Sequence, residues 1–564
     1  MQCEVDAVVV GAGVNGLVAA AGLARAGWAV ALVEGNPELG GFIASAERTL
    51  PGYTHDTYSS WHPLFTSGAA YAALGPELEE HGLRYRNTEG VITGSIGYSG
   101  YASVAYRDPE ATADRFASAR DRATYLKALQ RFLDDAEPIG ALMGAELRSV
   151  RALRAALALA RSARREGAGG IEGRLREVVT SGRGWCREQF EGPETDHLWV
   201  PWLLHAGLSP DHASGGFLIP VLAATVHGFG LPVVEGGAQG FVAAFESLLR
   251  AHGARIITGA WVDEILVREG RTIGVRAGGL TVHARRAVLA SVTPQALYGS
   301  LLNPASVPER VAEQAARFRY GRAEMQIHVA LSRPLQLSAA ELNDAPLVHL
   351  SDGSAGTAIA CAEAEAGLLP RRPTVVVGRQ HLLDPSRVPD GAGSLWLQLQ
   401  EVPFDPVGDA AGELDTKEGW TPDLARGYAD RVLGHLGRLA PGLADSVLAV
   451  DVITPVDLSR RNPNAVAGDP YGGSAELDQN FVWRPVPAAA RHATAIDGLW
   501  HIGASTHPGP GLGGGSGHLV ARLLTRARRT GATRAAGPKD AEQTGARPSA
   551  GFAAGNSQQQ GGRR

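Results

Sequence analysis

The sequence contains only three cysteines, Cys3, Cys186 and Cys361, among 564 residues, and no two of them form a CxxC pair. This scarcity argues against a disulfide framework and a structural zinc site, and it fits a reducing compartment. No apolar run approaches the ~18 residues that cross a bilayer, and no basic segment precedes the first apolar run as in a secretory signal. We therefore predict a cytoplasmic protein.

An excess of positive charge is also missing. The chain has 53 Lys and Arg against 58 Asp and Glu, which gives a net charge of −5. Because a mildly negative protein repels nucleic acid, we predict no nucleic-acid partner. The histidines near the candidate site have no metal-ligating residue at i+3 or i+4, so we predict no metal. The chain length predicts more than one domain.

The beginning of the chain has the pattern of a βαβ unit that binds a dinucleotide. We predict a strand over Val5–Val10, a helix over Leu17–Ala26 and a second strand over Trp28–Val33. A GxGxxG turn joins the first strand to the helix, and its candidate binding residues are Gly11, Gly13, Asn15 and Gly16. Glu34, which closes the second strand, is the candidate partner of the ribose hydroxyls.

Each glycine of this turn has its own physical role. Gly11 permits the tight turn, Gly13 lets the backbone approach a pyrophosphate, and Gly16 allows the helix to pack closely on the strand. The helix N-terminus adds unpaired N–H groups and the positive end of a dipole. By itself, this unit accommodates NAD as well as FAD.

A second glycine-rich segment follows a predicted strand over Gly498–Gly503. Seven glycines lie between Gly503 and Gly517, and a predicted helix over His518–Arg528 comes next. Such a loop leaves backbone N–H groups free and makes room for a large flat ligand.

Three separated segments resemble one family, the FAD-dependent phytoene desaturase-like oxidoreductases. This family includes carotenoid oxidoreductases and proteins of the pyridine-nucleotide-disulfide-oxidoreductase-domain type. The matching segments are Gly11–Glu34 with the Gly40-Gly41 pair, Glu235–Val262, and Trp500–Gly517. Together they reach from one end of the chain to the other, so the combination is more specific than any one of them.

The resemblance implies an α/β fold with a discontinuous Rossmann-type FAD-binding domain, similar to that of amine oxidases and GDP-dissociation inhibitors, and an inserted α+β substrate domain. The expected ranges are 1–85, 225–300 and 490–528 for the FAD domain, and 86–224 and 301–489 for the substrate domain. Residues 529–564 are rich in Gly, Ala, Gln and Arg, and we expect them to form a disordered tail.

The resemblance also implies that the cofactor is FAD. Gly40 and Gly41 would contact the pyrophosphate or the flavin, and Val262 would pair its backbone with the adenine. The residues expected along the ribityl chain and the isoalloxazine ring are Gly503, Gly513 and Gly514.

The sequence departs from the family pattern at several positions. Phe42 stands where the family usually has a basic residue after the two glycines. The family's Asp-x-Gly-x-His-like stretch is matched only in part by the segment Asp56–His62. Asp478-Gln479 followed by Arg484-Pro485 resembles a subgroup other than the one best known for carotenoid work, which weakens a carotenoid assignment.

The candidate catalytic side chains are His62, His507 and Tyr58. Both histidines flank predicted flavin loops, and imidazole can move protons at neutral pH. Tyr58 is equally well placed to form a wall of the substrate pocket. A flavin that takes hydride from an activated carbon can do so without a strong base.

We therefore predict an FAD-dependent oxidoreductase that dehydrogenates or desaturates an organic small molecule, such as an isoprenoid or another lipophilic or natural-product intermediate. The electron acceptor is left open between oxygen, a quinone and others. One alternative is a redox-neutral flavin isomerase. Another is a non-enzymatic binding protein with a GDP-dissociation-inhibitor-like fold, although such a protein would have no use for a flavin cradle.

A basic amphipathic helix is predicted over Leu142–Arg165. Its apolar residues are Leu147, Val150, Leu153 and Leu157, and arginines surround them. We expect this helix to pack on the substrate domain and expose its basic face. Peripheral contact with a membrane surface is the alternative.

Overall fold

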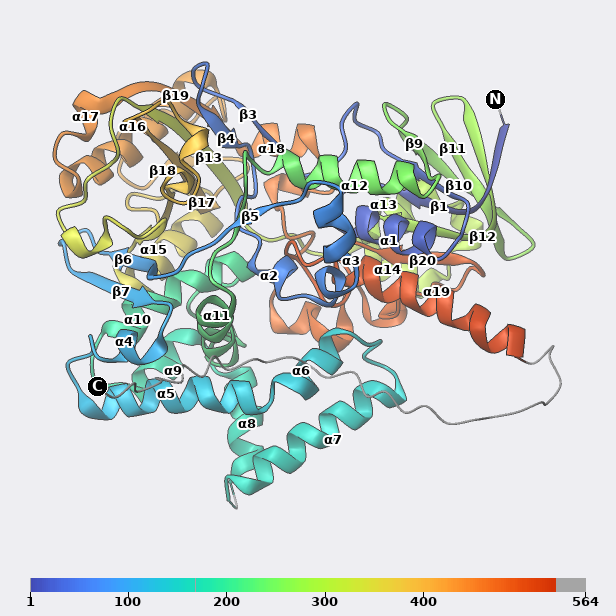
Figure 1. Cartoon of the computed structure of the whole chain (residues 1–564), viewed down its shortest axis with the longest axis horizontal. Helices are drawn as coiled ribbons and strands as arrows, with labels where there is room; N and C mark the ends of the chain where they lie inside the picture. Colours follow the sequence, from blue (N-terminus) through green and yellow to red (C-terminus); the bar gives the residue numbers. More distant parts are fainter. Residues whose placement is uncertain (1, 168, 534–564) are drawn as a thin grey trace, which may run out of the picture. The chain divides into compact units, whose positions relative to one another are not determined.

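The structure, a computed structural model, describes residues 2–167 and 169–533 (Figure 1). The chain comprises two units, Met1–Leu523 and Leu524–Arg564, and both large β-sheets lie in the first. The predicted tail starts within helix α19 (Gly515–Thr533), and its residues 534–564 lie outside the described part of the chain.

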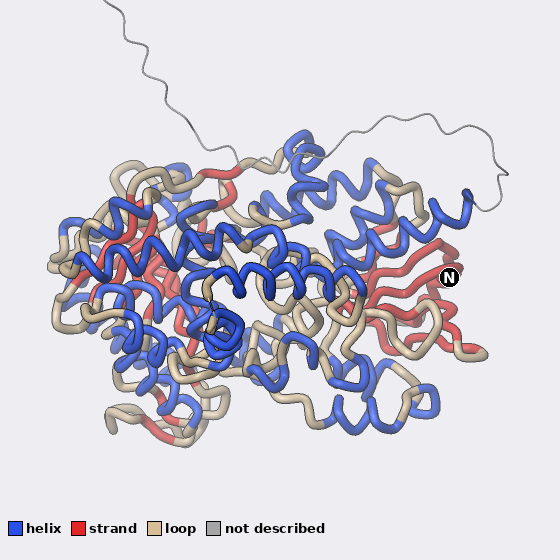
Figure 2. Tube along the Cα trace, turned by 90° about the horizontal axis from the view of Figure 1, so that it is seen from below, coloured by secondary structure: helices blue, strands red, loops and turns tan. Residues whose placement is uncertain are grey.

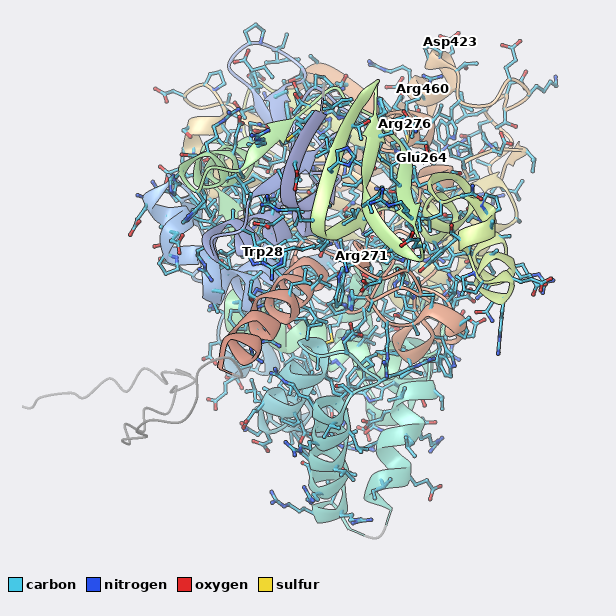
Figure 3. The ribbon with its side chains drawn as sticks, turned by 90° about the vertical axis from the view of Figure 1, so that its right-hand side faces the viewer. Trp28, Glu264, Arg271, Arg276, Asp423 and Arg460 are labelled. Atoms are coloured by element: carbon cyan, nitrogen blue, oxygen red, sulfur yellow. The ribbon has the colours of Figure 1, made fainter. Side chains whose placement is uncertain are left out.

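The first sheet contains the predicted dinucleotide-binding unit. Its strand order is β10-β11-β12-β1-β2-β9, and β20 also pairs with β12. Strands β9, β2, β1, β12 and β20 are parallel neighbours, whereas β10, β11 and β12 form antiparallel hairpins. The strands are β1 (Gln2–Val10), β2 (Val30–Val33), β9 (Arg255–Ile257), β10 (Val262–Arg268), β11 (Arg271–Ala277), β12 (Leu280–Ser291) and β20 (Leu499–Ile502). On the hairpin, Arg276 and Glu264 form a cross-strand ion pair at 2.5 Å (Figure 3).

Helix α1 (Val14–Arg25) connects β1 to β2, as the sequence predicts for a βαβ unit. Its buried residues are mostly alanine and leucine, which lets it pack closely against the parallel strands. Helix α12 (Gln239–Ala251) likewise buries Phe241 and Phe245 and ends at His252, followed by Gly253 at a φ of +72°. The predicted α/β class and Rossmann-type unit are confirmed.

The second sheet has the order β19-β13-β17-β16-β14-β6-β7. Figure 2 shows it as a group of strands separate from the first sheet. Its strands are β6 (Val91–Ile96), β7 (Ala102–Tyr106), β13 (Ala323–Leu331), β14 (Leu347–Leu350), β16 (Val375–Gly378), β17 (Gly393–Val402) and β19 (Val447–Ile453). One core joins this sheet to α16 (Pro422–Leu439). Another joins it to α5 (Ala119–Asp134), α9 (Gly182–Gln189), α10 (Glu194–Trp199) and α11 (Gly215–Phe229).

Short elements complete the fold. Two-stranded sheets pair β3 (Ser45–Glu47) with β4 (Thr54–Asp56), β5 (Tyr85–Arg86) with β8 (Val233–Val234), and β15 (Leu368–Leu369) with β18 (Gly408–Asp409). The other helices are α2 (Pro63–Thr66), α3 (Ala69–Glu80), α4 (Pro109–Ala113), α6 (Ala136–Met143), α7 (Val150–Arg165), α8 (Gly170–Val179), α13 (Pro294–Ala296), α14 (Glu309–Ala316), α15 (Gly353–Glu365), α17 (Leu443–Ser446) and α18 (Pro455–Arg461).

The first sheet draws its strands from residues 2–33, 255–291 and 499–502, and the second from residues 91–106 and 323–453. The finer domain limits at 85, 225, 300 and 490 stay a prediction, because residues up to Leu523 form one compact unit. Within residues 2–167 and 169–533, no helix has both the length and the apolar character needed to cross a membrane.

The predicted helix over Leu142–Arg165 is wrong in two respects. It is broken between α6 and α7, because the Ser149 side chain accepts a hydrogen bond from the Ala152 N–H and starts a new helix there. Its apolar stripe is also not packed inward: Val150, Leu153 and Leu157 are 66%, 59% and 47% exposed. Helix α7 instead buries Ala152, Ala155 and Ala163. Figure 3 shows α7 and α8 extending away from the rest of the ribbon.

The beginning of α19 lies directly against the beginning of α1. The Gly517 N–H donates to the Asn15 side-chain oxygen at 3.2 Å, and a Cβ at Gly517 would overlap the Asn15 carbonyl oxygen. Only glycine therefore allows the two helices to approach this closely.

We predict that Gly517→Ala lowers the free energy of unfolding by about 1–3 kcal/mol, because the new methyl group forces the helices apart. Gly434→Ala is the matched control, since Gly434 is an exposed helical glycine with open space around its Cβ position. That change should be neutral or stabilising by up to ~1 kcal/mol. Urea unfolding of both variants checks the prediction, and equal midpoints would contradict it.

Candidate active site

The GxGxxG turn has the geometry of a phosphate cradle. Gly11 adopts a φ of +90°, and a Cβ at Gly16 would overlap the Gly11 carbonyl oxygen, so helix and turn touch through backbone atoms. A Cβ at Gly13 would meet no atom within 4 Å. Gly13 is therefore not required by packing, and it leaves space in front of the α1 N-terminus, where free N–H groups attract an anion.

The Gly40-Gly41 loop lies over this turn. The Gly40 N–H donates to the Ala12 carbonyl at 3.0 Å. The Cβ position of Gly41 is 3.1 Å from the Gly13 Cα. A side chain at Gly41 would narrow the space beside Gly13, whereas one at Gly40 would overlap the Ile43 carbonyl oxygen and the Val242 side chain.

Glu34 is held at the end of β2 by backbone donors. Its carboxylate accepts hydrogen bonds from the N–H groups of Ala12 at 2.7 Å and Asn36 at 2.9 Å. The Ala260 N–H bonds to the Glu34 carbonyl at 3.0 Å, which brings the segment leading to Val262 alongside. The residues predicted to contact the nucleotide come from separate segments. Three of them, Gly13, Glu34 and Val262, thus lie at one end of the first sheet.

The C-terminal glycine loop closes on the same region. The Gly503 N–H donates to the Ser516 hydroxyl at 3.2 Å. A Cβ at Gly513 would lie 3.2 Å from the Leu64 carbonyl oxygen, and one at Gly514 would lie 2.6 Å from the Val18 side chain. The loop therefore packs against both α2 and α1.

A cavity of about 310 Å³ starts at these loops and continues to the second sheet. Its nucleotide end is lined by Gly13, Asn15, Gly40, Gly41 and Gly503. Its far end is lined by Trp202, Leu222, Val226, Leu231, Leu347 and Trp396. Gly11, Gly16, Glu34, Val262, Gly513 and Gly514 are not among its lining residues, and they support the cradle from outside the cavity.

The two candidate histidines do not line the cavity. His62 is fully buried, its Nδ1 hydrogen-bonds the Tyr85 hydroxyl at 2.9 Å, and burial lowers its pKa to about 4. His507 hydrogen-bonds the Leu142 carbonyl at 3.0 Å, and burial also lowers its pKa to about 4. Both rings are therefore neutral at physiological pH, and their catalytic role stays a prediction from the sequence.

Tyr58 does line the cavity. Its ring lies 5.2 Å from the ring of Phe42, which occupies the position where a basic residue was expected. Its carbonyl accepts hydrogen bonds from Trp396 at 2.9 Å and Gln326 at 3.2 Å. Burial raises the pKa of the phenol, so Tyr58 contributes a neutral aromatic wall.

A polar row that sequence reasoning missed crosses the middle of the cavity. It consists of Glu324 and Gln326 on β13 and Gln398 and Gln400 on β17. Glu324 is almost fully buried, and its carboxyl accepts a hydrogen bond from the Gln398 amide at 2.6 Å. Burial raises its pKa to about 7. The only sequence signal was a set of polar residues at alternate positions within two otherwise apolar strands.

A buried ion cluster fixes the loops around the cavity. The Arg387 guanidinium contacts Asp56 at 2.8 Å and Asp384 at 3.1 Å. These carboxylates also accept hydrogen bonds from the N–H groups of Ala238 and Gly236, each at 2.7 Å. These bonds connect the segment Asp56–His62, which matches the family pattern only in part, to the start of the segment Glu235–Val262.

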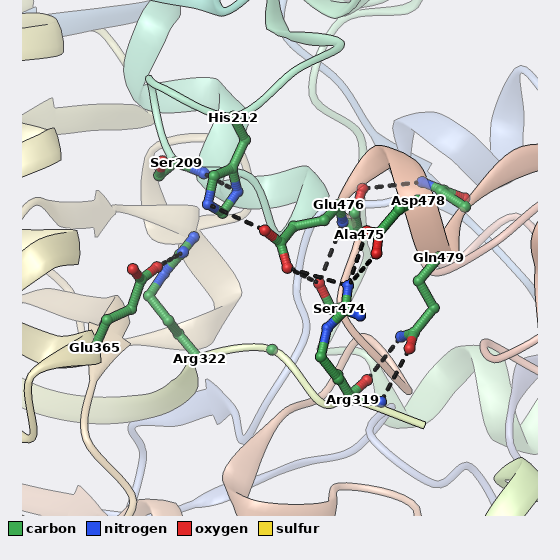
Figure 4. Close-up of polar contacts among 12 residues, drawn as sticks. Ser209, His212, Arg319, Arg322, Glu365, Ser474, Ala475, Glu476, Asp478 and Gln479 are labelled. Atoms are coloured by element: carbon green, nitrogen blue, oxygen red, sulfur yellow. Dashed lines mark hydrogen bonds and ion pairs between the residues drawn. The ribbon is translucent and has the colours of Figure 1, made fainter. Parts of the chain in front are cut away.

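The Asp478-Gln479 and Arg484-Pro485 pattern also has a structural role. Arg484 is buried, and its guanidinium donates to the carbonyls of Ala504 at 2.9 Å and Tyr471 at 3.0 Å. Figure 4 shows how Gln479 and Asp478 hold Arg319: the Gln479 amide bonds the Arg319 backbone in both directions, and Asp478 pairs with its guanidinium at 2.8 Å. Arg484 therefore anchors the C-terminal loop beside the cavity.

Comparison with known proteins shows which proteins the chain resembles. Residues 9–74 match the NAD(P)-binding Rossmann-like domain. The pyridine nucleotide-disulfide oxidoreductase domain-containing protein 2 of Rattus norvegicus is 29% identical over 561 residues, covering 93% of this chain and 94% of that protein. The hydroxyneurosporene desaturase of Rubrivivax gelatinosus is 28% identical over 542 residues, covering 92% of each. The chain is a relative of the phytoene desaturase-like oxidoreductases.

A solved structure supports the same fold. A putrescine oxidase variant superposes with a TM-score of 0.58 at 19% identity, covering 95% of this chain and all of the other. This likeness confirms an α/β fold of the amine-oxidase type. As a relative of the phytoene desaturase-like oxidoreductases, the chain has a fold that binds flavin or NAD(P).

We predict that Glu324 makes stability depend on pH. Below about pH 4.5 this carboxyl is protonated in both the folded and the unfolded chain. Between about pH 4.5 and 7 only the unfolded chain loses this proton, so the free energy of unfolding falls as pH rises, by up to ~3 kcal/mol.

Glu324→Gln should remove this fall. The difference in unfolding free energy between the wild type and the variant, measured by urea unfolding from pH 4.5 to 8, should decline up to about pH 7 and then level off. Glu418→Gln, at an exposed glutamate, is the control and should show no such trend. A constant difference for Glu324→Gln would refute the buried titration.

Proposed function

We propose that the protein is an FAD-dependent oxidoreductase that dehydrogenates or desaturates a lipophilic or natural-product small molecule. The observation that carries the proposal is a single cavity that joins the glycine-built cradle at Gly13, Gly41 and Gly503 to an apolar, aromatic chamber at Trp202 and Trp396. A redox cofactor held in the cradle would face a substrate held in the chamber. The desaturase relative at 28% identity supports the reaction class.

The residues present fit FAD. The empty space at the Cβ position of Gly13 suits the pyrophosphate, with Gly40 and Gly41 beside it. Glu34 would accept hydrogen bonds from the ribose, and the Val262 backbone would contact the adenine. Gly503, Gly513 and Gly514 would border the ribityl chain and the flavin ring. When bound, FAD supplies a hydride acceptor.

The protein's own part is to position the substrate and exclude water. Trp202, Trp396 and Leu347 give the chamber apolar walls, and Tyr58 lies between chamber and cradle. His62 and His507 are neutral and engaged elsewhere, so we assign them structural roles. The proposed domain division and the cytoplasmic location are retained as predictions from the sequence.

The alternatives differ in the fate of the flavin. A dehydrogenase leaves the flavin reduced after anaerobic reaction with its substrate, so the yellow colour fades, whereas a redox-neutral isomerase returns it to the oxidised state. A pure binding protein would contain no flavin at all. The glycine-lined cradle favours a cofactor-bearing protein over that last alternative.

We predict that the purified protein is yellow, with absorbance near ~450 nm, and that Gly13→Val abolishes FAD retention. Valine has room to fit in the protein alone, because nothing lies within 4 Å of the Cβ position, so folding should survive while the phosphate is blocked. Gly140→Val, at an exposed glycine with equally open surroundings, is the control and should keep its FAD.

Absorbance of the released cofactor, together with circular dichroism to verify folding, checks both variants. A wild-type protein that stays colourless after reconstitution with FAD would refute the cofactor. Normal FAD content in Gly13→Val would refute the assignment of the phosphate to this turn.

We also propose that α7 and α8 contact the surface of an anionic membrane. Their outward side exposes Val150, Leu153, Leu157, Leu175 and Val179, the last two at 64% and 60%. Exposed arginines accompany this apolar stripe at positions 151, 154, 161, 164 and 165. Apolar side chains flanked by cations suit the boundary between headgroups and acyl chains.

We predict that replacing Leu153 and Leu157 together by aspartate reduces binding to phosphatidylcholine vesicles with about one third phosphatidylglycerol by about fivefold or more. Cosedimentation measures the bound fraction. Ile359→Asp, at an apolar residue 61% exposed on α15, is the control and should bind as the wild type does. If the wild-type protein does not bind these vesicles, the membrane role is excluded.

A further inference from the structure

The polar row in the cavity has a defined geometry. Gln326 on β13 and Gln398 on β17 are directly paired across the two antiparallel strands. Glu324 and Gln400 lie two residues further along their strands, where a bulge interrupts the pairing. All four line the cavity between its nucleotide end and its apolar far end.

Hydrogen bonds fix which way each amide points. The Gln326 NH2 donates to the Tyr58 carbonyl at 3.2 Å, and the Gln398 NH2 donates to Glu324 at 2.6 Å. The Gln400 NH2 donates to the Tyr471 hydroxyl at 2.9 Å, and that hydroxyl gives its single proton to the Leu204 carbonyl at 2.9 Å. In each of these glutamines the nitrogen is already engaged.

Three oxygens of the row have no partner among the described residues. They are Oε1 of Glu324, Oε1 of Gln326 and Oε1 of Gln400, and each is completely buried. Buried acceptors of this kind are costly unless a donor reaches them. A molecule in the cavity that carries hydrogen-bond donors would satisfy them.

The charge of the lining narrows the identity of that molecule. Among the described residues that line the cavity there is no lysine and no arginine, and Glu324 is the only carboxyl. An anionic group would find no cationic counter-charge there and would face the Glu324 carboxyl. A neutral hydroxyl or a cationic amine would find three acceptors.

We propose that the substrate carries hydroxyl or amino groups that donate hydrogen bonds to the acceptor row of Glu324, Gln326 and Gln400, on an apolar body that extends toward Trp202 and Trp396. This inference rests on the proposed function and specifies its substrate class. A pure hydrocarbon would leave all three oxygens unpaired. Glu324 and the two glutamines then determine specificity, because they select a donor-bearing head group.

Four probes of one shape test the proposal: 3-phenylpropan-1-ol, 3-phenylpropylamine, 3-phenylpropanoate and propylbenzene. Their binding to the full chain is measured by isothermal titration calorimetry at pH 8. The alcohol and the amine should bind about tenfold or more tightly than the hydrocarbon and the carboxylate, because only they supply donors without negative charge. Propylbenzene or the carboxylate binding as tightly as the alcohol would overturn the proposal, as would no binding of the alcohol and the amine.

Variants separate the charge of Glu324 from the acceptor row. Glu324→Gln keeps a carbonyl oxygen but loses the charge, so the amine should weaken about tenfold while the alcohol changes by less than about threefold. Gln326→Leu combined with Gln400→Leu should weaken the alcohol about tenfold. The exposed-site change Glu418→Gln should alter neither.

Unchanged binding in both site variants would overturn the proposal. If a variant fails to fold, the order of affinities of the four probes for the wild-type protein still tests it. The FAD content of each sample is read from its absorbance before titration. A colourless protein that prefers the alcohol and the amine would refute the flavin proposal alone. A yellow protein that prefers propylbenzene would refute only the substrate class.

Discussion

The buried guanidinium of Arg387 is the contact on which the arrangement of the cavity depends. It lies between the carboxylates of Asp56 and Asp384, and each carboxylate in turn holds a backbone N–H at the start of the α12 region. Removal of Arg387 would leave two carboxylates buried without a cation, which folded proteins tolerate poorly. Three segments far apart in the sequence are therefore held in place together, and Tyr58, which lines the cavity, follows directly on one of them.

Local patterns in the sequence predicted local structure well, but they did not predict which side chains would line the cavity. The first βαβ unit depends on contacts within a short segment, so glycine spacing was sufficient to predict it. His62 and His507 were chosen because they adjoin predicted flavin loops, yet neither lines the cavity, and each hydrogen-bonds a neighbouring segment through Tyr85 or Leu142. Glu324 could not be recognised, because its environment is formed by β17, which follows it only after about seventy residues of chain.

The helix α7 illustrates a related limit. Leucine at helical spacing usually marks the buried face of a helix, but here the alanines at positions 152, 155 and 163 are buried, and Leu153 is exposed. Small side chains permit a close approach between helices, and the larger apolar ones remain outside. Hydrophobicity alone could not distinguish the two faces, because both are apolar.

The contact between Gly517 and Asn15 also determines when the nucleotide end can form during synthesis. The first turn of α1 precedes its packing partner by about five hundred residues of chain. β20 and the loop beginning at Gly503 likewise join the first sheet only after nearly five hundred residues have been made. The nucleotide end therefore cannot be complete until the chain has been made as far as α19, about five hundred residues after α1.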